Sequence, residues 1–254
     1  MLASDFRKMA REKLAGKWAT AVCMTLAYGV VFFVIGFVQG LLPQEGLIAL
    51  LASIGVYAIE TPLVFGLVFA FFKLFYGKDV HAFSFWSLGF DNFGRSWGIA
   101  FRTILKLLVP LILMIVSIVL IISNGIMSYN ASFSLSGSSS DILITGLLTI
   151  ISFILFVVSS IWLTVKSYHY LLAQYVAFDN PNLTPKECVE KSKELMSNRR
   201  GKLFGLQFSF IGWMILSCFT FYIGFLWLLP YMQMATIAFY HVVANKENSK
   251  NSEI

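Results

Sequence analysis

The chain has 254 residues, of which 58% are hydrophobic, 16% aromatic and only 13% charged. A soluble domain carries roughly 25% charged residues, so this chain has too few charges to cover a water-facing surface. The aromatic content excludes a disordered chain. Three cysteines without a C-x-x-C pair exclude a disulfide scaffold. The composition therefore predicts a polytopic membrane protein of the all-α class.

Six stretches meet the requirement of about 20 mostly apolar residues for a helix that crosses the membrane. In chain order they cover residues 18–42, 47–75, 101–123, 142–178, 203–222 and 225–244. Their apolar runs are continuous, whereas the strands of a membrane β-barrel alternate over about ten residues. We predict a single integral membrane domain, residues 1–254, with six transmembrane helices and amphipathic helices at the interface.

Lysine and arginine residues are concentrated in every second one of the links, which are the segments that connect consecutive spans, and in the two terminal segments. All but one of the 19 lie before the first span, around the second and fourth links, or after the last span, and the exception is Lys166. The other three links, including the Ser-rich stretch 124–141, contain none. Because the cytoplasmic side retains positive charge, both termini are expected to be cytoplasmic. Topology explains the basic charge, so we infer contact with anionic lipids of the inner leaflet and no nucleic acid partner.

Two polar segments have the pattern of amphipathic helices. In residues 5–17 the apolar positions Phe6, Met9, Ala10 and Leu14 recur at helical spacing beside basic residues, which is typical of a helix on an anionic leaflet. In residues 184–200, Thr184 is placed to cap, Pro185 suits the first helical position, and Glu187 completes a capping box. The apolar side of this second helix is expected either to bind the membrane or a partner, or to pack against the bundle. That side comprises Cys188, Val189, Ser192, Leu195 and Met196.

Three similar openings indicate a threefold organisation. A glycine, a basic residue and an aromatic residue occur together near Trp18, Trp97 and Phe204, each after a polar cytoplasmic segment and before two spans. Three hairpin repeats over residues 1–77, 78–178 and 179–254 would produce this pattern. A shared need for basic and aromatic anchors at the inner interface would produce it as well, and both interpretations stay open.

The C-terminal third resembles a known family. The stretches Phe208–Trp213 (FSFIGW), Ile223–Trp227 (IGFLW), Pro230–Tyr231 and Phe239–Tyr240 look like the pattern of the domain-of-unknown-function 975 family of bacterial integral membrane proteins. Asp179–Pro181 and Ser192–Met196 (SKELM) belong to the same pattern, and residues 10–18 at the start and 66–73 with 90–94 in the middle are similar to that family as well. The resemblance implies a multi-pass protein of the bacterial plasma membrane. It supplies no activity and no catalytic residue.

The sequence contains no catalytic or metal-binding constellation that points to an enzyme. Its three histidines lie on separate segments, and the zincin, P-loop and nucleophile-elbow motifs are absent. The pairs Asp91–Asn92 and Asp179–Asn180 occur in the cytoplasmic links, where such residues usually form turns and caps. We therefore expect no catalytic residue, no metal and no cofactor.

Glu60 and Lys166 are the candidate binding residues, because ionisable groups within a span usually face the bundle interior or a cavity. Each lies equally far before the inner end of its span, Glu60 before Lys73 and Lys166 before Asp179. We therefore predict that the two charges face each other. His169, Gln207 and Gln233 are the other polar residues within the spans.

Three functions fit this sequence. The first is a non-enzymatic scaffold, accessory or immunity-type protein of the envelope with a protein partner in the membrane. The alternative is a small-solute or proton-coupled transporter or channel that uses Glu60 and Lys166, with Pro62, Pro110 and Pro230 breaking helices at its site. A lipid-processing membrane enzyme is the least favoured, since no catalytic motif supports it.

Overall fold

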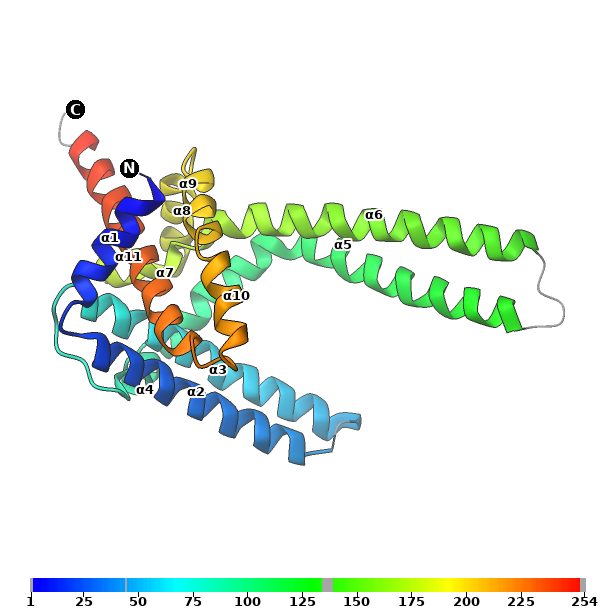
Figure 1. Ribbon diagram of the computed structural model, residues 1–254, viewed down its shortest axis with the longest axis horizontal. Coiled ribbons are helices and arrows are strands. Elements are labelled where there is room, and N and C mark those ends of the chain that lie inside the picture. The colour runs from blue at the N-terminus through cyan, green and yellow to red at the C-terminus, as the bar shows by residue number, and fades with distance from the viewer. Residues whose placement is uncertain (1, 44, 134–138, 252–254) are drawn as a thin grey trace. The chain divides into compact units, whose positions relative to one another are not determined.

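The structure, a computed structural model, describes residues 2–43, 45–133 and 139–251. Every regular element in these ranges is a helix. In chain order they are α1 (Ala3–Leu14), α2 (Trp18–Leu41), α3 (Gly46–Phe75), α4 (Ser84–Asp91), α5 (Phe93–Phe133), α6 (Ser139–Tyr170), α7 (Ala173–Asp179), α8 (Pro185–Leu195), α9 (Arg200–Phe208), α10 (Ile211–Phe219) and α11 (Phe225–Asn251) (Figure 1). The chain divides into two compact units. Unit 1 comprises Met1–Phe101 with Leu171–Ile254, and unit 2 comprises Arg102–Tyr170.

Six helical stretches of the described residues are long and apolar enough to cross a membrane. They are Trp18–Leu41, Gly46–Phe75, Phe93–Asn130, Leu143–Asp179, Arg200–Phe219 and Phe225–Asn245. The predicted all-α membrane fold with six such helices is thus confirmed, but several bounds differ. The Ser-rich stretch 124–141 was predicted to be a link, yet α5 continues through Phe133 and α6 begins at Ser139. The fourth and fifth spans are each interrupted by a short turn, after Tyr170 and after Phe208.

The three prolines expected to break helices do not do so. Pro62, Pro110 and Pro230 lie inside α3, α5 and α11, each of which continues as one helix. A proline removes one helical hydrogen bond and crowds the carbonyl four residues earlier, and packing around it offsets this cost. All three side chains are buried.

The two halves of α3 meet different surroundings. Leu47, Leu50 and Ile54 in the first half are 69%, 58% and 56% exposed, whereas Leu63 and Ala70 in the second half are fully buried. Exposed apolar side chains on a membrane-like helix are suited to lipid, while the buried ones belong to a protein core. Within unit 1, the apolar side chains of α3 thus change near Pro62 from exposed ones, which are suited to lipid, to ones that are buried in the protein core.

Helix α4 packs along this second half of α3 through glycines. A Cβ atom on Gly66 would overlap the Phe85 carbonyl, and one on Gly89 would overlap the Pro62 carbonyl, so the two backbones touch. This approach inserts the Phe85 ring, which is fully buried, against Leu63 and Ala27. The link between the second and third spans is therefore part of the core of unit 1.

The first turns of α5 join the same layer by hydrogen bonds. The Trp97 indole donates to the Ala58 carbonyl at 3.3 Å. The Arg95 guanidinium donates to three carbonyls of the α7–α8 loop, those of Asn180, Pro181 and Leu183. One cation therefore ties three carbonyls of this loop to the start of α5.

The centre of unit 1 is an aromatic cluster formed by α3, α7 and α11. Phe178 stacks on Phe69 with ring centroids 4.3 Å apart and contacts Phe72 at 5.6 Å. Tyr175 lies 5.7 Å from Tyr240, whose hydroxyl donates to the Asp179 carboxylate at 2.9 Å. The cluster holds α7 between α3 and α11 and gives the acidic residue a partner.

Unit 2 is the α5–α6 hairpin, and its seam carries small polar residues every seventh position. Ser117 and Asn124 on α5, and Thr145, Ser152 and Ser159 on α6, are all buried. Asn124 Nδ2 donates to Ser152 Oγ at 3.3 Å. A seven-residue repeat of this kind is typical of antiparallel helices that pack along a continuous seam.

The glycine contact between α3 and α4 yields a prediction. Replacing Gly66 by Ala forces a Cβ into the Phe85 carbonyl, and we expect it to lower stability by about 1–3 kcal/mol, as overpacked cores do. Thermal unfolding in detergent, followed by size-exclusion chromatography, measures the change.

Gly36→Ala in α2 is the matched control, because nothing lies within 4 Å of the added Cβ. Alanine is also the better helix former, so this variant should match or exceed the parent in stability. Equal behaviour of the two variants would show that α3 and α4 do not approach at Gly66.

Candidate functional site: a pocket between α1, α10 and α11

Helix α1 is docked on α11 in unit 1 (Figure 1). Phe6, Ala10 and Leu14 are 3%, 0% and 0% exposed, and the Phe6 ring meets Phe239 edge-on at 5.3 Å. The apolar face that was expected to enter the leaflet is thus used inside the protein. The reason is tertiary, since α11 offers an apolar surface to the same stripe. Contact of α1 with anionic lipid stays an expectation that concerns its basic side chains.

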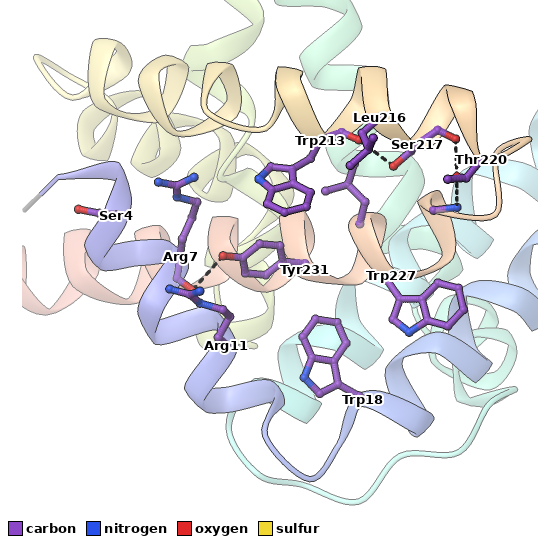
Figure 2. Close-up of a pocket in the computed structure, with 12 residues that line it drawn as sticks. Ser4, Arg7, Arg11, Trp18, Trp213, Leu216, Ser217, Thr220, Trp227 and Tyr231 are labelled. Atoms are coloured by element: carbon purple, nitrogen blue, oxygen red, sulfur yellow. Dashed lines mark hydrogen bonds between the residues drawn. The ribbon is translucent and has the colours of Figure 1, made fainter.

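The docked helix forms one wall of an open pocket of about 510 Å³. Figure 2 shows how side chains of α1, the start of α2, α10 and α11 surround it. Its lining residues are Ser4, Arg7, Arg11, Trp18, Trp213, Leu216, Ser217, Thr220, Gly224, Trp227, Leu228 and Tyr231. The wall is therefore mostly aromatic and apolar, with two arginines at one end.

Tyr231 lies at the middle of the pocket. In the view of Figure 2 its ring lies between Trp213 above and Trp18 below, and the Trp18 ring is 6.3 Å away. The Tyr231 hydroxyl points toward α1 and donates to the backbone carbonyl of Arg7 at 3.4 Å. The Phe210 ring meets Tyr231 edge-on at 5.2 Å and fixes its other side. Tyr231 thus connects the apolar wall to the arginine end.

The arginine end of the pocket contains an unsatisfied buried donor. The Nε atom of Arg7 is buried and has no hydrogen-bond partner within the described part of the chain. Arg11 lies one turn further along α1 and is close enough to Tyr231 to interact with it electrostatically. Buried donors are normally satisfied, so the arrangement suits an acceptor from outside the chain.

The opposite end of the pocket is formed by the tight turn between α10 and α11. Thr220 Oγ1 accepts from the Gly224 backbone N–H at 3.0 Å, and Phe221 and Tyr222 adopt φ of 51° and 66°. A Cβ on Gly224 would lie 2.7 Å from Ser217 Oγ and 3.0 Å from Ser217 Cα, so the start of α11 packs closely against the end of α10. Trp213 and Trp227 beside the turn are 55% and 50% exposed, which leaves this end open at the surface.

The candidate residues Glu60 and Lys166 lie in different units. Glu60, in unit 1, follows the exposed run of α3 and is close enough to Tyr28 of α2 to interact electrostatically. Lys166, in unit 2, continues the seven-residue repeat of Ser152 and Ser159, and its ammonium lies 4.8 Å from the centre of the Trp162 ring. Their mutual pairing stays a prediction. Neither residue lines the pocket.

The second amphipathic helix and its capping box are confirmed as α8, although the helix ends at Leu195 and a turn separates it from α9, which begins at Arg200. Thr184 Oγ1 accepts from the Glu187 backbone N–H at 3.4 Å, and the Glu187 carboxylate accepts from the Thr184 backbone N–H at 2.7 Å. These bonds from Thr184 hold the pKa of Glu187 below its usual value, so their stabilisation is present at neutral pH and lost as the pH falls through that lowered pKa. The whole predicted apolar side is buried, so α8 packs against the protein, as the second interpretation expected.

The two Asp-Asn pairs behave as caps and tertiary contacts. The Asn92 and Asn180 side chains donate to the carbonyls of Leu88 and Val176 within their own helix ends, and Asp179 accepts from Tyr240. Among the described residues, no group of three or more metal-ligating side chains comes together.

Sequence reasoning identified several pocket residues without bringing them together. Arg7 and Arg11 were assigned to a lipid-facing helix, and Trp18 to an inner-interface anchor. Trp213 and Tyr231 belong to the stretches that carry the family resemblance. The available signal was the placement of tryptophan and tyrosine near the ends of spans. This placement indicates how deep a residue lies in the membrane, but not which residues lie close to one another.

The docking of α1 generates the prediction for this site. Phe6→Ala removes the ring that anchors α1 to α11 and should cost about 3–5 kcal/mol, as for other buried phenylalanines. Because α1 is the wall that carries both arginines, we expect trypsin to cut at Arg7 and Arg11 several times faster than in the parent. Leu2→Ala is the control, since Leu2 is 74% exposed. Unchanged cleavage in Phe6→Ala would mean that α1 is not held by this contact.

Comparison with known proteins places the chain in a family without assigning an activity. No curated protein and no solved structure matches it. A family model described as "Protein of unknown function (DUF975)" matches residues 1–247, nearly the whole chain. The chain therefore belongs to the DUF975 family.

Proposed function

We propose that this protein is a non-enzymatic scaffold or accessory protein of the bacterial plasma membrane, of a kind that includes immunity-type protectors, and that it acts through a protein partner in the membrane. The observation that carries this proposal is the filled aromatic centre of unit 1. Its support is physical: a centre of interlocking rings suits a protein that holds a shape better than one that conducts a solute.

The packing of α11 illustrates the point. Ala235, Ile237, Ala238 and Phe239 are at most 1% exposed, and Tyr240 contributes its hydroxyl to Asp179. A transport path needs polar groups along its length to replace water. The contacts of α11 within unit 1 are mainly apolar and close-packed, so this helix is suited to stabilise the core of unit 1 and not to line a transport path.

The helical hairpins offer the surface for a partner. On the α5–α6 hairpin, Val119 and Ile154 are 58% and 56% exposed. In the seam, Asn124 pairs with Ser152, while Ser117 and Ser159 donate to carbonyls of their own helices. Membrane helices associate through packing and small residues once their own polar groups are satisfied. A hairpin with a satisfied seam and an apolar outside is suited to packing against another membrane helix.

A transporter is the second candidate, favoured by Glu60 and Lys166. Glu60 lies where the exposed run of α3 ends, and an ionisable group at such a position is costly unless it serves a function or has a partner. A lipid-processing enzyme has the least support, because no catalytic motif occurs in the sequence and no group of three or more His, Cys, Asp or Glu side chains comes together among the described residues.

Site-specific photocrosslinking tests the scaffold function. We expect a cross-linking residue at Val119 or Ile154 to give a discrete adduct with one membrane protein in native membranes. The same residue at the buried Ser117 is the control and should give none. Proton-coupled uptake by proteoliposomes of the pure protein, with lipid adducts alone, would favour the transporter.

The proposed topology, with both termini cytoplasmic, has its own test. Reporter fusions after Glu45, Ser138 and Tyr222 should report an external location. Fusions after Lys78, Lys193 and the C-terminus should report the cytoplasm, because the basic links stay on that side. An external signal after Lys193 would overturn the scheme.

The proposed pairing of Glu60 with Lys166 is tested by a double-mutant cycle. Glu60→Gln and Lys166→Met should each lower the folded yield in detergent, since each leaves an unpaired intramembrane charge. The double variant should recover much of that yield. If both single variants match the parent, the residues do not pair. If the double variant is stable but the cellular phenotype is lost, the pair belongs to a functional site.

A further inference from the structure

We propose that the pocket between α1, α10 and α11 binds one anionic phospholipid, with its phosphate at Arg7 and Arg11 and its acyl chains along the tryptophan wall. This site goes beyond the scaffold function and does not depend on it. We infer a lipid because the charge of the pocket, the chemistry of its wall and its open side all suit the same kind of ligand.

The charge of the pocket calls for an anion. Arg7 and Arg11 lie one turn apart on α1, and both line the same end. The buried Arg7 Nε has no partner among the described residues. Guanidinium groups favour phosphate oxygens because their planar donors match them two at a time. A phosphodiester at this end would supply an acceptor for Arg7 Nε.

The wall chemistry calls for an apolar body attached to that anion. Away from the arginines the lining consists mainly of Trp213, Leu216, Trp227 and Leu228. A free inorganic anion would leave this surface uncovered. Tryptophan and tyrosine combine an apolar ring with a polar group and are enriched where headgroups meet acyl chains. Trp18 and Tyr231 lie at the transition between the two ends, as such residues should.

Size and access determine how much of the lipid is enclosed. A volume of about 510 Å³ is within the range of ligand pockets, roughly 300–1,000 Å³, yet smaller than a whole phospholipid. The half-exposed Trp213 and Trp227 leave a side open. The pocket thus fits the headgroup region and the upper part of the chains, and the remaining chain length leaves through the open side.

The experiment compares lipid retention by the full-length protein in detergent, using native mass spectrometry. Phosphatidylglycerol and phosphatidylcholine with identical acyl chains are titrated in parallel. We expect one phosphatidylglycerol per chain to be retained with at least tenfold higher affinity than phosphatidylcholine. Arg7→Gln with Arg11→Gln should weaken phosphatidylglycerol about tenfold or more, because each basic residue near an anionic headgroup contributes to binding.

Lys8→Gln with Lys186→Gln is the matched control, since it removes the same charge from exposed positions outside the pocket. Equal weakening by both pairs would overturn the site in favour of diffuse surface charge. Leu216→Trp, at a 54% exposed position, fills the acyl end without changing charge and covers the case in which the arginine variant fails to fold. It should also release the lipid, and full retention would contradict the proposal. Displacement by millimolar inorganic phosphate alone would identify a phosphate site and overturn the lipid assignment.

Discussion

The arrangement of unit 1 depends on the backbone contact between α3 and α4. Gly66 and Gly89 carry no side chains, and this lets the two helices touch and brings Phe85 into the core. Once α4 lies along α3, the following residues begin α5 beside the same helix, where Trp97 reaches the Ala58 carbonyl. Arg95 is then placed to hold the α7–α8 loop. Each later contact uses a position that the glycine contact has already set.

The same chain of contacts continues to the pocket. The α7–α8 loop positions Asp179 for the hydroxyl of Tyr240, which fixes α11 against α7. Helix α11 in turn presents Phe239 and Tyr231 to α1. The positions of the arginines of α1 therefore depend on packing between α3, α4, α7 and α11, which lie away from the arginines in the sequence. A helix whose basic pattern predicts contact with a membrane surface thus also forms one wall of the pocket.

Burial distinguishes two kinds of apolar surface that look alike in composition. The first half of α3 and the outside of the α5–α6 hairpin expose large aliphatic side chains, while the second half of α3 and most of α11 bury theirs. In a soluble protein the exposed set would be a liability. In a membrane, such exposed side chains are suited to face lipid or a partner. On α3, the change from exposed to buried side chains marks where the core of unit 1 begins.

The sequence by itself determined the all-α membrane class, the six apolar helices and the capping box of α8, because hydropathy, helix length and capping depend on neighbouring residues. The apolar side of α8 followed from its periodicity as well, but its burial against the protein did not. Only the tertiary structure decided that the three prolines stay within continuous helices and that α1 docks on α11. It also decided that Arg7, Trp213 and Tyr231, more than 200 residues apart at the extremes, line one pocket. The physical reason is that periodicity shows which face of a helix is apolar, whereas the surface that covers this face is supplied by another segment, through contacts that no local pattern encodes.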